Sequence, residues 1–528
     1  MAKVLIADQL SPRAVEIFQQ KGVEVDVKTG LPPAELAAII GEYDGLALRS
    51  STKVTRDILS AATKLRVVGR AGIGIDNIDL AAATEKGVVV MNTPFGNSIT
   101  TAEHALSLML ALARDIPQAN ASTRAGKWEK NRFMGVELYG KILGVIGCGN
   151  IGAIVADRAV GLKMKVVAFD PFLTEDRARD LGIEKVSLDD LLARADFITL
   201  HTPLTEQTKN ILDAKALAKT RKGVRIINCA RGGLIDEAAL HEAIVAGHVA
   251  GAALDVFLTE PAKESPLFAL EQVICTPHLG ASTTEAQENV ALQVAEQMAD
   301  YLVHGAVVNA LNMPSLSAED APKLKPYLKL AEQLGSFMGQ AADQSFRTVS
   351  IAYQGHVTGL NLRPLSAVIL KGLLSPIMAG VNMVNAPVIA RQRDIVIKET
   401  RLEQAGDLNT LITVTLEGDN GSRSVAGTLL SDKPRVVAID GVPTEAELTG
   451  TMILTQNRDK PGFIGSLGTV LGENGVNIAS FFNGRSAPGA DALCLVSVDG
   501  NINELVLEKL SALPQVVRVK VLNFAREV

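Results

Sequence analysis

Three side chains that together can carry out hydride chemistry each follow an apolar, strand-like segment. They are Arg231, Glu260 and His278. In an open α/β sheet the loops after the strands face one crevice, so we expect the three side chains to meet there. Removal of hydride from a hydroxyl carbon requires a base, and imidazole is suited to that task near neutral pH. A carboxylate behind the imidazole fixes its tautomer and raises its pKa, and a guanidinium binds a substrate carboxylate in bidentate fashion.

A glycine-rich turn precedes these residues and is typical of nucleotide binding. Gly147, Gly149 and Gly152 form a G-x-G-x-x-G string after the apolar run 142–146 and before a helical pattern. Glycines permit a tight turn and a close approach to a pyrophosphate, and the helix N-terminus supplies free N–H groups. Asp170 ends the next strand, where a carboxylate accepts hydrogen bonds from a ribose and repels a 2′-phosphate. The motif predicts NAD rather than NADP as the cofactor, with a purely structural glycine turn as the alternative.

Taken singly, a histidine, arginine or glutamate is more often structural than catalytic. The joint arrangement favours catalysis, and we assign no catalytic role to the histidines outside it, which are His104, His201, His241, His248, His304 and His356. A second glycine string, 69–74, also follows a strand. No acidic residue ends the strand after it, so we interpret this string as a substrate loop.

The order of apolar runs and helical patterns predicts two α/β units, the second of them long enough for a complete doubly wound domain. Strand-like runs alternate with helical patterns over the first hundred residues and again over 142–275, which indicates parallel sheets covered by helices. A helix is expected at 100–113, and a capping box at 282–285 opens another that runs to about Leu302. The expected strands are 4–7, 23–27, 46–48, 67–68 and 88–90 in the first unit and 142–146, 166–169, 197–200, 225–228, 252–256 and 273–275 in the second.

Two smaller units are expected after these. A polar, proline-containing stretch, 314–326, predicts a linker, and mixed helical and strand patterns follow it. The last 78 residues have the order β-α-β-β-α-β of ferredoxin-like units, with Pro461 at the start of the first helix. The predicted domains are 1–98 with 282–312, 99–281, 317–449 and 451–528.

Composition excludes several classes of protein. The chain has 52 Lys and Arg against 58 Asp and Glu, a net charge of −6, which argues against a broad surface for nucleic acid or anionic membrane. The longest apolar stretch is interrupted by polar residues, so no membrane span is expected. Cys148, Cys229, Cys275 and Cys494 lie in apolar surroundings without a C-x-x-C pair. We expect buried, reduced thiols, a cytoplasmic location and no metal site.

Four strings resemble the family of D-isomer-specific 2-hydroxyacid dehydrogenases: LGVIGCGNIG (143–152), INCARGGLIDE (227–237), LDVFLTEP (254–261) and TPHLGAST (276–283). Three others are similar to the long members of that family, which oxidise 3-phospho-D-glycerate with NAD in the first step of L-serine synthesis: LALRSSTKVT (46–55), VVGRAGIGIDNID (67–79) and NTPFGNSITTAEH (92–104). The resemblance covers essentially the whole chain. It implies a Rossmann-type nucleotide domain inserted into a flavodoxin-like substrate domain, followed by an intervening domain and a ferredoxin-like ACT domain.

The resemblance also implies roles for individual residues. His278 is the expected acid/base, Glu260 its partner and Arg231 the clamp for the substrate carboxylate. The expected substrate-binding residues are Arg49, Arg70 and Asn97, with Lys130 reaching the site of a neighbouring subunit. The expected cofactor contacts are Gly147, Gly149, Asn150, Ile151, Gly152, Asp170, Thr202, Cys229, Ala230, Arg231, Asp255, His278, Leu279, Gly280 and Ala281.

The tail resembles the ACT module through NRDKPG (457–462) and GVNI (475–478). That resemblance implies L-serine bound by Asn457, Asp459 and Asn477 between paired modules, and a homo-oligomer, either dimer or tetramer. A dimerisation module without ligand is the alternative for this tail. For the whole chain, two alternatives stay open: another D-2-hydroxyacid dehydrogenase, such as a hydroxypyruvate or glyoxylate reductase, and a non-catalytic NAD-sensing corepressor.

Overall fold

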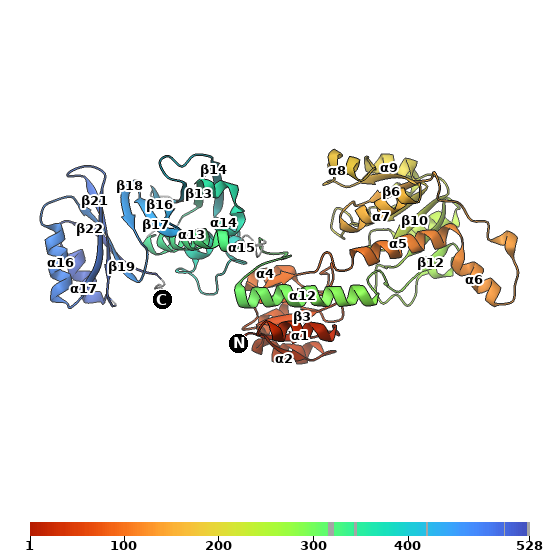
Figure 1. Ribbon diagram of the computed structural model, residues 1–528, viewed down its shortest axis with the longest axis horizontal. Coiled ribbons are helices and arrows are strands. Elements are labelled where there is room, and N and C mark those ends of the chain that lie inside the picture. The colour runs from red at the N-terminus through yellow and green to blue at the C-terminus, as the bar shows by residue number, and fades with distance from the viewer. Residues whose placement is uncertain (315–320, 343–345, 419–420, 501, 525–528) are drawn as a thin grey trace.

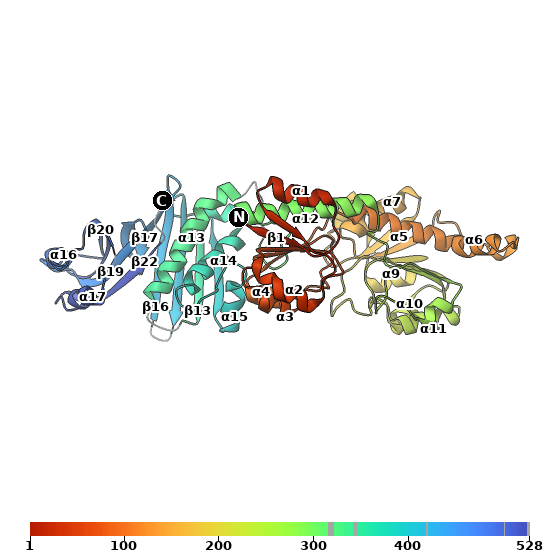
Figure 2. The same cartoon turned by 90° about the horizontal axis from the view of Figure 1, so that it is seen from below.

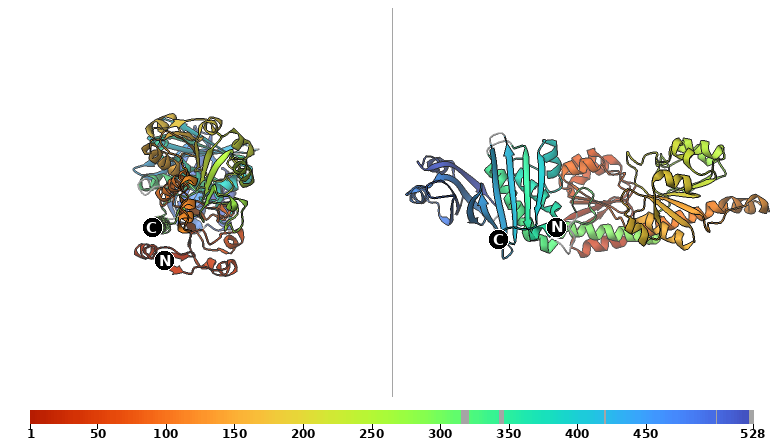
Figure 3. Two further views of the ribbon diagram at one scale, coloured as in Figure 1. Left: turned by 90° about the vertical axis from the view of Figure 1, so that its right-hand side faces the viewer. Right: turned by 90° about the horizontal axis from the view of Figure 1, so that it is seen from above.

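The chain folds into four units that follow one another in an elongated molecule. The computed structural model describes residues 1–314, 321–342, 346–418, 421–500 and 502–524. Figures 1 and 2 show the second unit at one end, the first beside it, then the third, and the fourth at the other end. The end-on view in Figure 3 shows how narrow this row is.

The first unit is a five-stranded parallel sheet in the flavodoxin-like order β2-β1-β3-β4-β5. The long helix α12 (Thr284–His304), from much later in the chain, packs on it so closely that a Cβ on Gly69 would lie 2.2 Å from the sulfur of Met298. This unit is therefore assembled from two separate stretches of sequence. Its remaining elements are β1 (Lys3–Ile6), α1 (Pro12–Gln20), β2 (Glu24–Val27), α2 (Pro33–Ile39), η1 (Ile40–Glu42), β3 (Gly45–Leu48), α3 (Arg56–Ala61), β4 (Val67–Arg70), α4 (Leu80–Lys86) and β5 (Val89–Met91).

The second unit is a seven-stranded parallel sheet in the order β12-β11-β10-β9-β6-β7-β8, a Rossmann-type order with one added strand. The chain reverses its direction of winding between β6 and β9, and ligands bind at such a switch point. The elements are α5 (Ser98–Ala113), α6 (Ile116–Arg124), η2 (Lys130–Arg132), β6 (Ile142–Ile146), α7 (Asn150–Gly161), β7 (Lys165–Phe169), α8 (Glu175–Asp180), β8 (Glu184–Lys185), α9 (Leu188–Arg194), β9 (Phe197–Leu200), α10 (Ala214–Lys219), β10 (Val224–Asn228), α11 (Glu237–Val245), β11 (Val249–Leu254), η3 (Pro266–Ala269) and β12 (Val273–Cys275).

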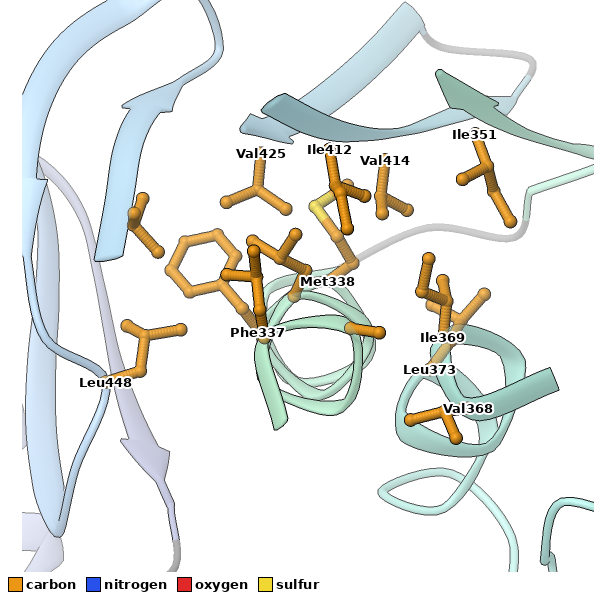
Figure 4. Close-up of a cluster of buried hydrophobic side chains, with 14 of the residues drawn as sticks. Phe337, Met338, Ile351, Val368, Ile369, Leu373, Ile412, Val414, Val425 and Leu448 are labelled. Atoms are coloured by element: carbon orange, nitrogen blue, oxygen red, sulfur yellow. The ribbon is translucent and has the colours of Figure 1, made fainter. Parts of the chain in front are cut away.

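The third unit is a mixed six-stranded sheet with two long helices against one face. Figure 4 shows Phe337 and Met338 packed beneath Ile412 and Val425 of the sheet. Glycines let the two helices approach closely, since a Cβ on Gly335 would lie 2.2 Å from a backbone oxygen of the other helix. The strand order is β14-β13-β15-β16-β17-β18. The elements are α13 (Ala321–Ala341), β13 (Thr348–Gly355), η4 (His356–Gly359), α14 (Leu362–Leu374), α15 (Ala386–Gln392), β14 (Val396–Leu402), β15 (Thr410–Gly418), β16 (Gly421–Leu430), β17 (Lys433–Ile439) and β18 (Val442–Ala446).

The fourth unit is a four-stranded antiparallel sheet in the ferredoxin-like order β20-β21-β19-β22. One face carries two helices, and the other adds Met452, Leu454 and Leu495 to the core of the third unit. The third and fourth units therefore share a hydrophobic core. The elements are β19 (Thr451–Arg458), α16 (Phe463–Glu473), β20 (Ile478–Arg485), β21 (Asp491–Val498), α17 (Glu504–Ser511) and β22 (Val516–Asn523).

A short asparagine-rich turn joins the third unit to the first. The side chain of Asn382 donates a hydrogen bond to the backbone oxygen of Gly87 at 2.8 Å, just after α4. Val384 is buried within the core of the first unit. Asn385 is also buried, and its side chain donates to the backbone oxygen of Glu85 at 3.4 Å. We call residues 382–385 the clasp.

The predicted fold class is confirmed, with flavodoxin-like and Rossmann-type sheets in the first two units. The two-residue strand β8 escaped prediction because it is too short to show a periodicity. Among the described residues, no helix combines the length and the apolar content needed to cross a bilayer.

The predicted linker, 314–326, is wrong in its second half. Helix α13 begins at Ala321 and contains Pro326, while 315–320 lie outside the described residues. Leu324, Leu330 and Leu334 of this helix are buried. Their packing outweighs the cost of a proline inside a helix.

Two helix starts also differ from prediction by a residue or two. The cap of α12 is Thr283 rather than Ser282, because its hydroxyl accepts the N–H of Ala286 at 3.2 Å. Helix α16 is capped by Gly462 with φ of 93°, so Pro461 lies before the helix instead of opening it. Local side-chain geometry decides such boundaries, and sequence patterns do not resolve it.

The prediction of four buried thiols is correct for two of them. Cys229 and Cys494 are buried, Cys148 is half-buried and Cys275 is exposed. Cys275 ends β12, a three-residue strand at the edge of its sheet with a neighbour on one side only. The apolar sequence around it does not show this edge position.

Candidate active site

The predicted base and its carboxylate partner form a direct hydrogen bond. Nδ1 of His278 lies 2.6 Å from Oε2 of Glu260. The other carboxylate oxygen accepts the N–H of Phe257 at 3.0 Å, which fixes the carboxyl group. Because Nδ1 donates to the carboxylate, Nε2 of the neutral imidazole keeps its lone pair for a proton from a ligand. The His278 side chain is 49% exposed, so a ligand can reach it.

This contact shifts the pKa of both groups. The hydrogen bond to Glu260 raises the pKa of His278, burial opposes that rise and the negative charge of Glu260 adds to it. Burial alone would raise the pKa of Glu260, but hydrogen bonds from His278 and from the N–H of Phe257 hold it below its ordinary value. At neutral pH the glutamate is therefore an anion, and the imidazole is a stronger base than a free one.

One fully buried carboxylate, Asp255, holds the loop that carries His278. Its Oδ1 accepts the hydroxyl of Thr276 at 2.6 Å and the N–H of Leu279 at 2.7 Å, and its Oδ2 accepts the N–H of Gly280 at 2.8 Å. Its backbone oxygen accepts the N–H of His278 at 2.9 Å. His278 has φ of 56°, in the left-handed region that non-glycine residues seldom adopt. The bonds to Asp255 keep the loop in that conformation.

His104, which sequence reasoning left without a role, completes this network. Its Nε2 lies 3.2 Å from Oδ1 of Asp255. Burial would raise the pKa of Asp255, but hydrogen bonds from His104 and Thr276 and from the N–H of Leu279 keep it below its ordinary value. Ligand atoms of His104, Cys229 and Asp255 lie within 4.8 Å of one another. Burial raises the pKa of the Cys229 thiol, so without a metal the thiol is protonated at neutral pH.

Two predicted anion-binding arginines from different units lie close enough for their charges to repel each other. Arg231, in the loop after β10, donates from Nε to Asp76 of the first unit at 2.9 Å and from Nη1 to the backbone oxygen of Ala230 at 2.7 Å. Arg70, at the end of β4, donates from Nε to Asn77 at 3.0 Å. Burial and then the like charge of Arg231 lower the pKa of Arg70 to about 10. The cluster thus carries excess positive charge, which an anionic substrate would relieve.

The loop of Arg49 is held by two side chains that sequence reasoning missed. The buried carboxylate of Asp8 accepts the N–H of Arg49 at 2.7 Å and the hydroxyl of Thr52 at 2.7 Å. The amide of Asn77 donates to the backbone oxygens of Arg49 and Thr52 at 2.7 and 2.6 Å. Asn77 therefore ties the loops of Arg49 and Arg70 together. The string 67–79 lies in this region, but nothing in its residue types shows which side chains make the ties.

The three glycines of the nucleotide motif each meet the requirement for a bound pyrophosphate. Gly147 has φ of 91°. Gly149 caps α7, and a Cβ there would meet nothing within 4 Å, which leaves room for a phosphate beside the helix N-terminus. A Cβ on Gly152 would lie 2.0 Å from the backbone oxygen of Gly147, so only glycine permits this close packing. Asn150 and Ile151 open the helix.

Other cofactor candidates surround this turn. Asp170 directly follows β7, and its carboxylate accepts the N–H groups of Cys148 and Phe172 at 2.8 and 2.7 Å. The hydroxyl of Thr202 is buried beside Gly147 and has no hydrogen-bond partner. A phosphate oxygen would supply one. The remaining candidates lie in the loops after β10, β11 and β12, at the same edge of the sheet: Cys229, Ala230, Arg231, Asp255, His278, Leu279, Gly280 and Ala281.

The last two substrate candidates differ in their placement. Asn97 caps α5 where the first and second units meet, and its buried side-chain oxygen has no partner. Helices α6 and η2 form an arm that projects from the second unit away from the first (Figure 1). Lys130 lies in η2 of this arm. Arg132 of the same turn holds the arm through Glu271 at 2.7 Å. The chain's own site therefore does not contain Lys130.

The three effector candidates lie in the fourth unit, at the opposite end of the molecule (Figure 1). Asp459 accepts Nη1 of Arg485 at 2.9 Å, and Asn477 donates to Asp499 at 2.7 Å. Asn457 is buried with its side-chain oxygen unpartnered. Within the described part of the chain, the hydrogen bonds of these three side chains go to other residues and none joins two of the three.

Comparison with known proteins identifies the family. The family model described as "D-isomer specific 2-hydroxyacid dehydrogenase, NAD binding domain" matches residues 106–280, and that of the "D-3-phosphoglycerate dehydrogenase intervening domain" matches 323–440. The D-3-phosphoglycerate dehydrogenase of Methanocaldococcus jannaschii is 44% identical over 99% of this chain and 100% of its own length. That of Bacillus subtilis is 40% identical over the same shares of both chains. The chain belongs to the D-3-phosphoglycerate dehydrogenase family.

Solved structures agree with this family. A glyoxylate reductase from Paecilomyes thermophila matches with a TM-score of 0.56 and 30% identity, over 59% of this chain and 98% of that one. The TT0316 protein of Thermus thermophilus matches with a TM-score of 0.53 and 35% identity, over 57% of this chain and 96% of that one. As a member of the D-3-phosphoglycerate dehydrogenase family, the chain is an oxidoreductase, and its second unit is an NAD-binding domain.

Proposed function

We propose that this protein oxidises 3-phospho-D-glycerate to 3-phosphooxypyruvate with NAD, the first step of L-serine synthesis. The observation that carries the proposal is the junction of the first and second units. There a histidine–glutamate pair comes from the same sheet edge as Arg231, and Arg231 pairs with Asp76 of the other unit and repels Arg70 of that unit. The substrate carries a carboxylate and a phosphate beside the reacting hydroxyl, which suits such a cluster. The names of full-length relatives support the same substrate.

His278 acts as the base in the proposed reaction. Its Nε2 takes the proton of the C2 hydroxyl while NAD, when bound, accepts the hydride from C2. Glu260 stabilises the imidazolium that forms, through the bond at Nδ1. In the reverse direction His278 returns the proton. Asp255 keeps His278 in place through the loop after β12.

The arginines bind and orient the substrate. Arg231 takes the carboxylate and polarises the neighbouring oxygen, while Arg49 and Arg70 take the phosphate together with Asn97. The lowered pKa of Arg70 supports this assignment, since a second negative charge offsets the repulsion between Arg70 and Arg231. Lys130 would reach this site only from a neighbouring subunit.

The glycine turn binds the cofactor pyrophosphate, and Asp170 binds the adenosine ribose. The open space at Gly149 and the unpartnered hydroxyl of Thr202 support the first assignment. The position of Asp170 directly after β7 supports the second, and its charge would repel the 2′-phosphate of NADP.

The active enzyme is proposed to be a homo-oligomer, either a dimer or a tetramer, with a dimer contact through the second unit. Large apolar side chains beside η2 support this, because Trp128 is 86% exposed and Met134 78%. The fourth unit is proposed to be an ACT domain that binds L-serine through Asn457, Asp459 and Asn477 between two copies. The unpartnered oxygen of Asn457 supports a ligand there.

The proposed domains are 1–98 with 282–312, 99–281, 317–449 and 451–528. The packing of α12 on the first sheet and of α5 on the second supports the first two. Four free thiols support a cytoplasmic location.

A substrate panel tests the function directly. NADH formation is followed with NAD and 3-phospho-D-glycerate, D-lactate or D-glycerate, and NADH consumption with hydroxypyruvate or glyoxylate, each with and without L-serine. The proposal predicts the highest kcat/KM for 3-phospho-D-glycerate. Preference for hydroxypyruvate or glyoxylate would support a reductase instead. NAD binding without any turnover would support a sensing protein.

A further inference from the structure

We propose that Asp76 is a positioning residue that orients the guanidinium of Arg231 for the substrate carboxylate, acting from the neighbouring unit. Asp76 lies in the loop between β4 and α4 of the first unit, and Arg231 in the loop after β10 of the second. Their side chains join at 2.9 Å. The inference deepens the proposed function and rests on it, because Arg231 must bind the substrate for its orientation to matter.

The contacts of Arg231 leave one edge of its guanidinium for a ligand. A guanidinium has five N–H donors in a planar fork. Nε donates to Asp76, and one Nη1 proton donates to the backbone oxygen of Ala230 at 2.7 Å. No hydrogen bond among the described residues uses the protons of Nη2 or the second Nη1 proton, and this pair of nitrogens matches the two oxygens of a carboxylate, while Nη2 also packs against the backbone of Gly74. Asp76 therefore fixes the plane of the group through Nε and leaves these protons to another acceptor.

The loop of Asp76 is shaped to receive this guanidinium. A Cβ on Gly74 would lie 1.6 Å from Nη2 of Arg231 and 2.9 Å from Oδ2 of Asp76, so the group lies directly against the loop backbone. The next residue, Asn77, makes the corresponding contact with Nε of Arg70. Two consecutive side chains thus hold two arginines from two units, each at Nε. Because both contacts are made at Nε, Asp76 and Asn77 each fix the direction of one guanidinium group.

The negative charge of Asp76 also stabilises the two neighbouring arginines in their charged forms. Arg70 and Arg231 repel each other, and Asp76 is one of two nearby carboxylates that offset this repulsion before an anionic substrate arrives. The side chain of Asp76 is 65% exposed. An ion pair this exposed contributes little to folding stability. The contact should therefore be visible in kinetics and not in thermal stability.

Two other interpretations make different predictions. If Asp76 only formed a surface ion pair, its removal would change neither kinetics nor stability. If Asp76 competed with the substrate carboxylate for Arg231, its removal would lower KM. A positioning role predicts a higher KM, because a freed guanidinium must be ordered when the substrate binds.

Initial-rate kinetics of the full chain with NAD and 3-phospho-D-glycerate separate these cases. Asp76→Ala should lower kcat/KM about 10- to 100-fold, the range for loss of a hydrogen bond to a charged group, mainly through KM. Asp76→Asn, which keeps an acceptor oxygen, should recover part of the loss. NAD affinity and Tm should stay at wild-type values. An unchanged or lower KM in Asp76→Ala would overturn the proposal.

A matched control is available in the same unit. Glu85 pairs with Arg56 at 2.7 Å on the exposed surface, outside the contacts of Arg231. Glu85→Gln should change neither KM nor kcat. An equal rise in KM in this control would assign the Asp76 effect to lost charge alone and contradict positioning.

A double-mutant cycle tests whether Asp76 acts through Arg231. In an Arg231→Lys background, Asp76→Ala should have at most a twofold further effect on kcat/KM, because a lysine lacks the Nε that Asp76 holds. Independent, multiplicative effects would contradict the proposal. A wild-type chain without activity on 3-phospho-D-glycerate would contradict the proposed function and, with it, this inference. If the wild type were active but the effects of the Asp76 and Arg231 substitutions were not coupled, only the role of Asp76 would be contradicted.

Discussion

The first two units and the last two differ in how their candidate sites are built. Around His278 and Arg231 the polar side chains of one chain converge, and most are held by hydrogen bonds to neighbouring residues. Asp255, for example, accepts hydrogen bonds from the N–H groups of Leu279 and Gly280. In the fourth unit, Asp459 and Asn477 bind separate partners, and of the three candidates Asn457 alone has an unpartnered buried oxygen. The candidate catalytic residues thus converge within one chain, whereas the candidate effector residues do not.

This contrast gives an order to the experiments. Changes at the catalytic site should act strongly on turnover, because its geometry already exists in the folded chain. Changes at the clasp between the first and third units should act on stability and leave the catalytic contacts intact.

The largest effect is expected from His278→Ala. Loss of a positioned base typically reduces turnover by about 10²- to 10⁴-fold, so kcat should fall by that range. NAD affinity, measured by quenching of protein fluorescence, should remain close to wild type, since the glycine turn is untouched. A variant that keeps full turnover would break the assignment of the base.

The second-largest effect is expected from Glu260→Gln, which should change the pH dependence of kcat/KM for the oxidation. Oxidation requires neutral His278, so kcat/KM should rise with pH through the pKa of His278, which Glu260 raises above its ordinary value. Without the carboxylate that pKa falls, so the rise should shift to lower pH while the plateau drops about tenfold or more. A profile shifted to higher pH, or unmoved, would contradict the pairing. Asp189→Asn, on the exposed surface, serves as the control.

A smaller effect is expected from Asp170→Ala. Its loss removes an acceptor for the ribose and the charge that repels a 2′-phosphate, so the NAD-to-NADP ratio of kcat/KM should fall about tenfold. Kinetics with both cofactors measure it. If discrimination stayed constant while NAD binding weakened, Asp170 would only hold the glycine turn through Cys148.

The smallest effect is expected from Gly87→Ala at the clasp. Gly87 has φ of 78°, and a Cβ there would lie 2.2 Å from the side-chain nitrogen of Asn382. Gly30→Ala is a matched control, because its φ is 74° and a Cβ there would meet nothing within 4 Å. Both changes strain the backbone by about 1 kcal/mol or more. Gly87→Ala should lower Tm further, with kcat unchanged. Equal Tm values would show that the clasp does not stabilise the joined units.

Sequence patterns predicted the fold of the first two units well because its signals are local. The strands are short apolar runs between helical patterns. The glycine turn lies within six residues, and each of Arg231, Glu260 and His278 follows its own strand. Fold class and topology then place these residues at one sheet edge.

The residues that hold the site escaped prediction because their contacts join distant parts of the chain. Asp76 meets Arg231 only after the two units have packed together, and His104 meets Asp255 only after α5 has packed on the sheet of the second unit. Asp8 and Asn77 look like ordinary turn residues, although they fix two loops. Pro326 looked like a linker residue, because the burial of its helix depends on the sheet of the third unit.

The most direct test of the account compares two substrates that differ only in the phosphate. NADH formation by the full chain is measured with 3-phospho-D-glycerate and with D-glycerate at saturating NAD. With Arg49 and Arg70 binding the phosphate, the account predicts a kcat/KM at least about 100-fold higher for 3-phospho-D-glycerate, in line with loss of paired, charge-assisted hydrogen bonds. Equal values for the two substrates, or no NADH from either, would contradict it.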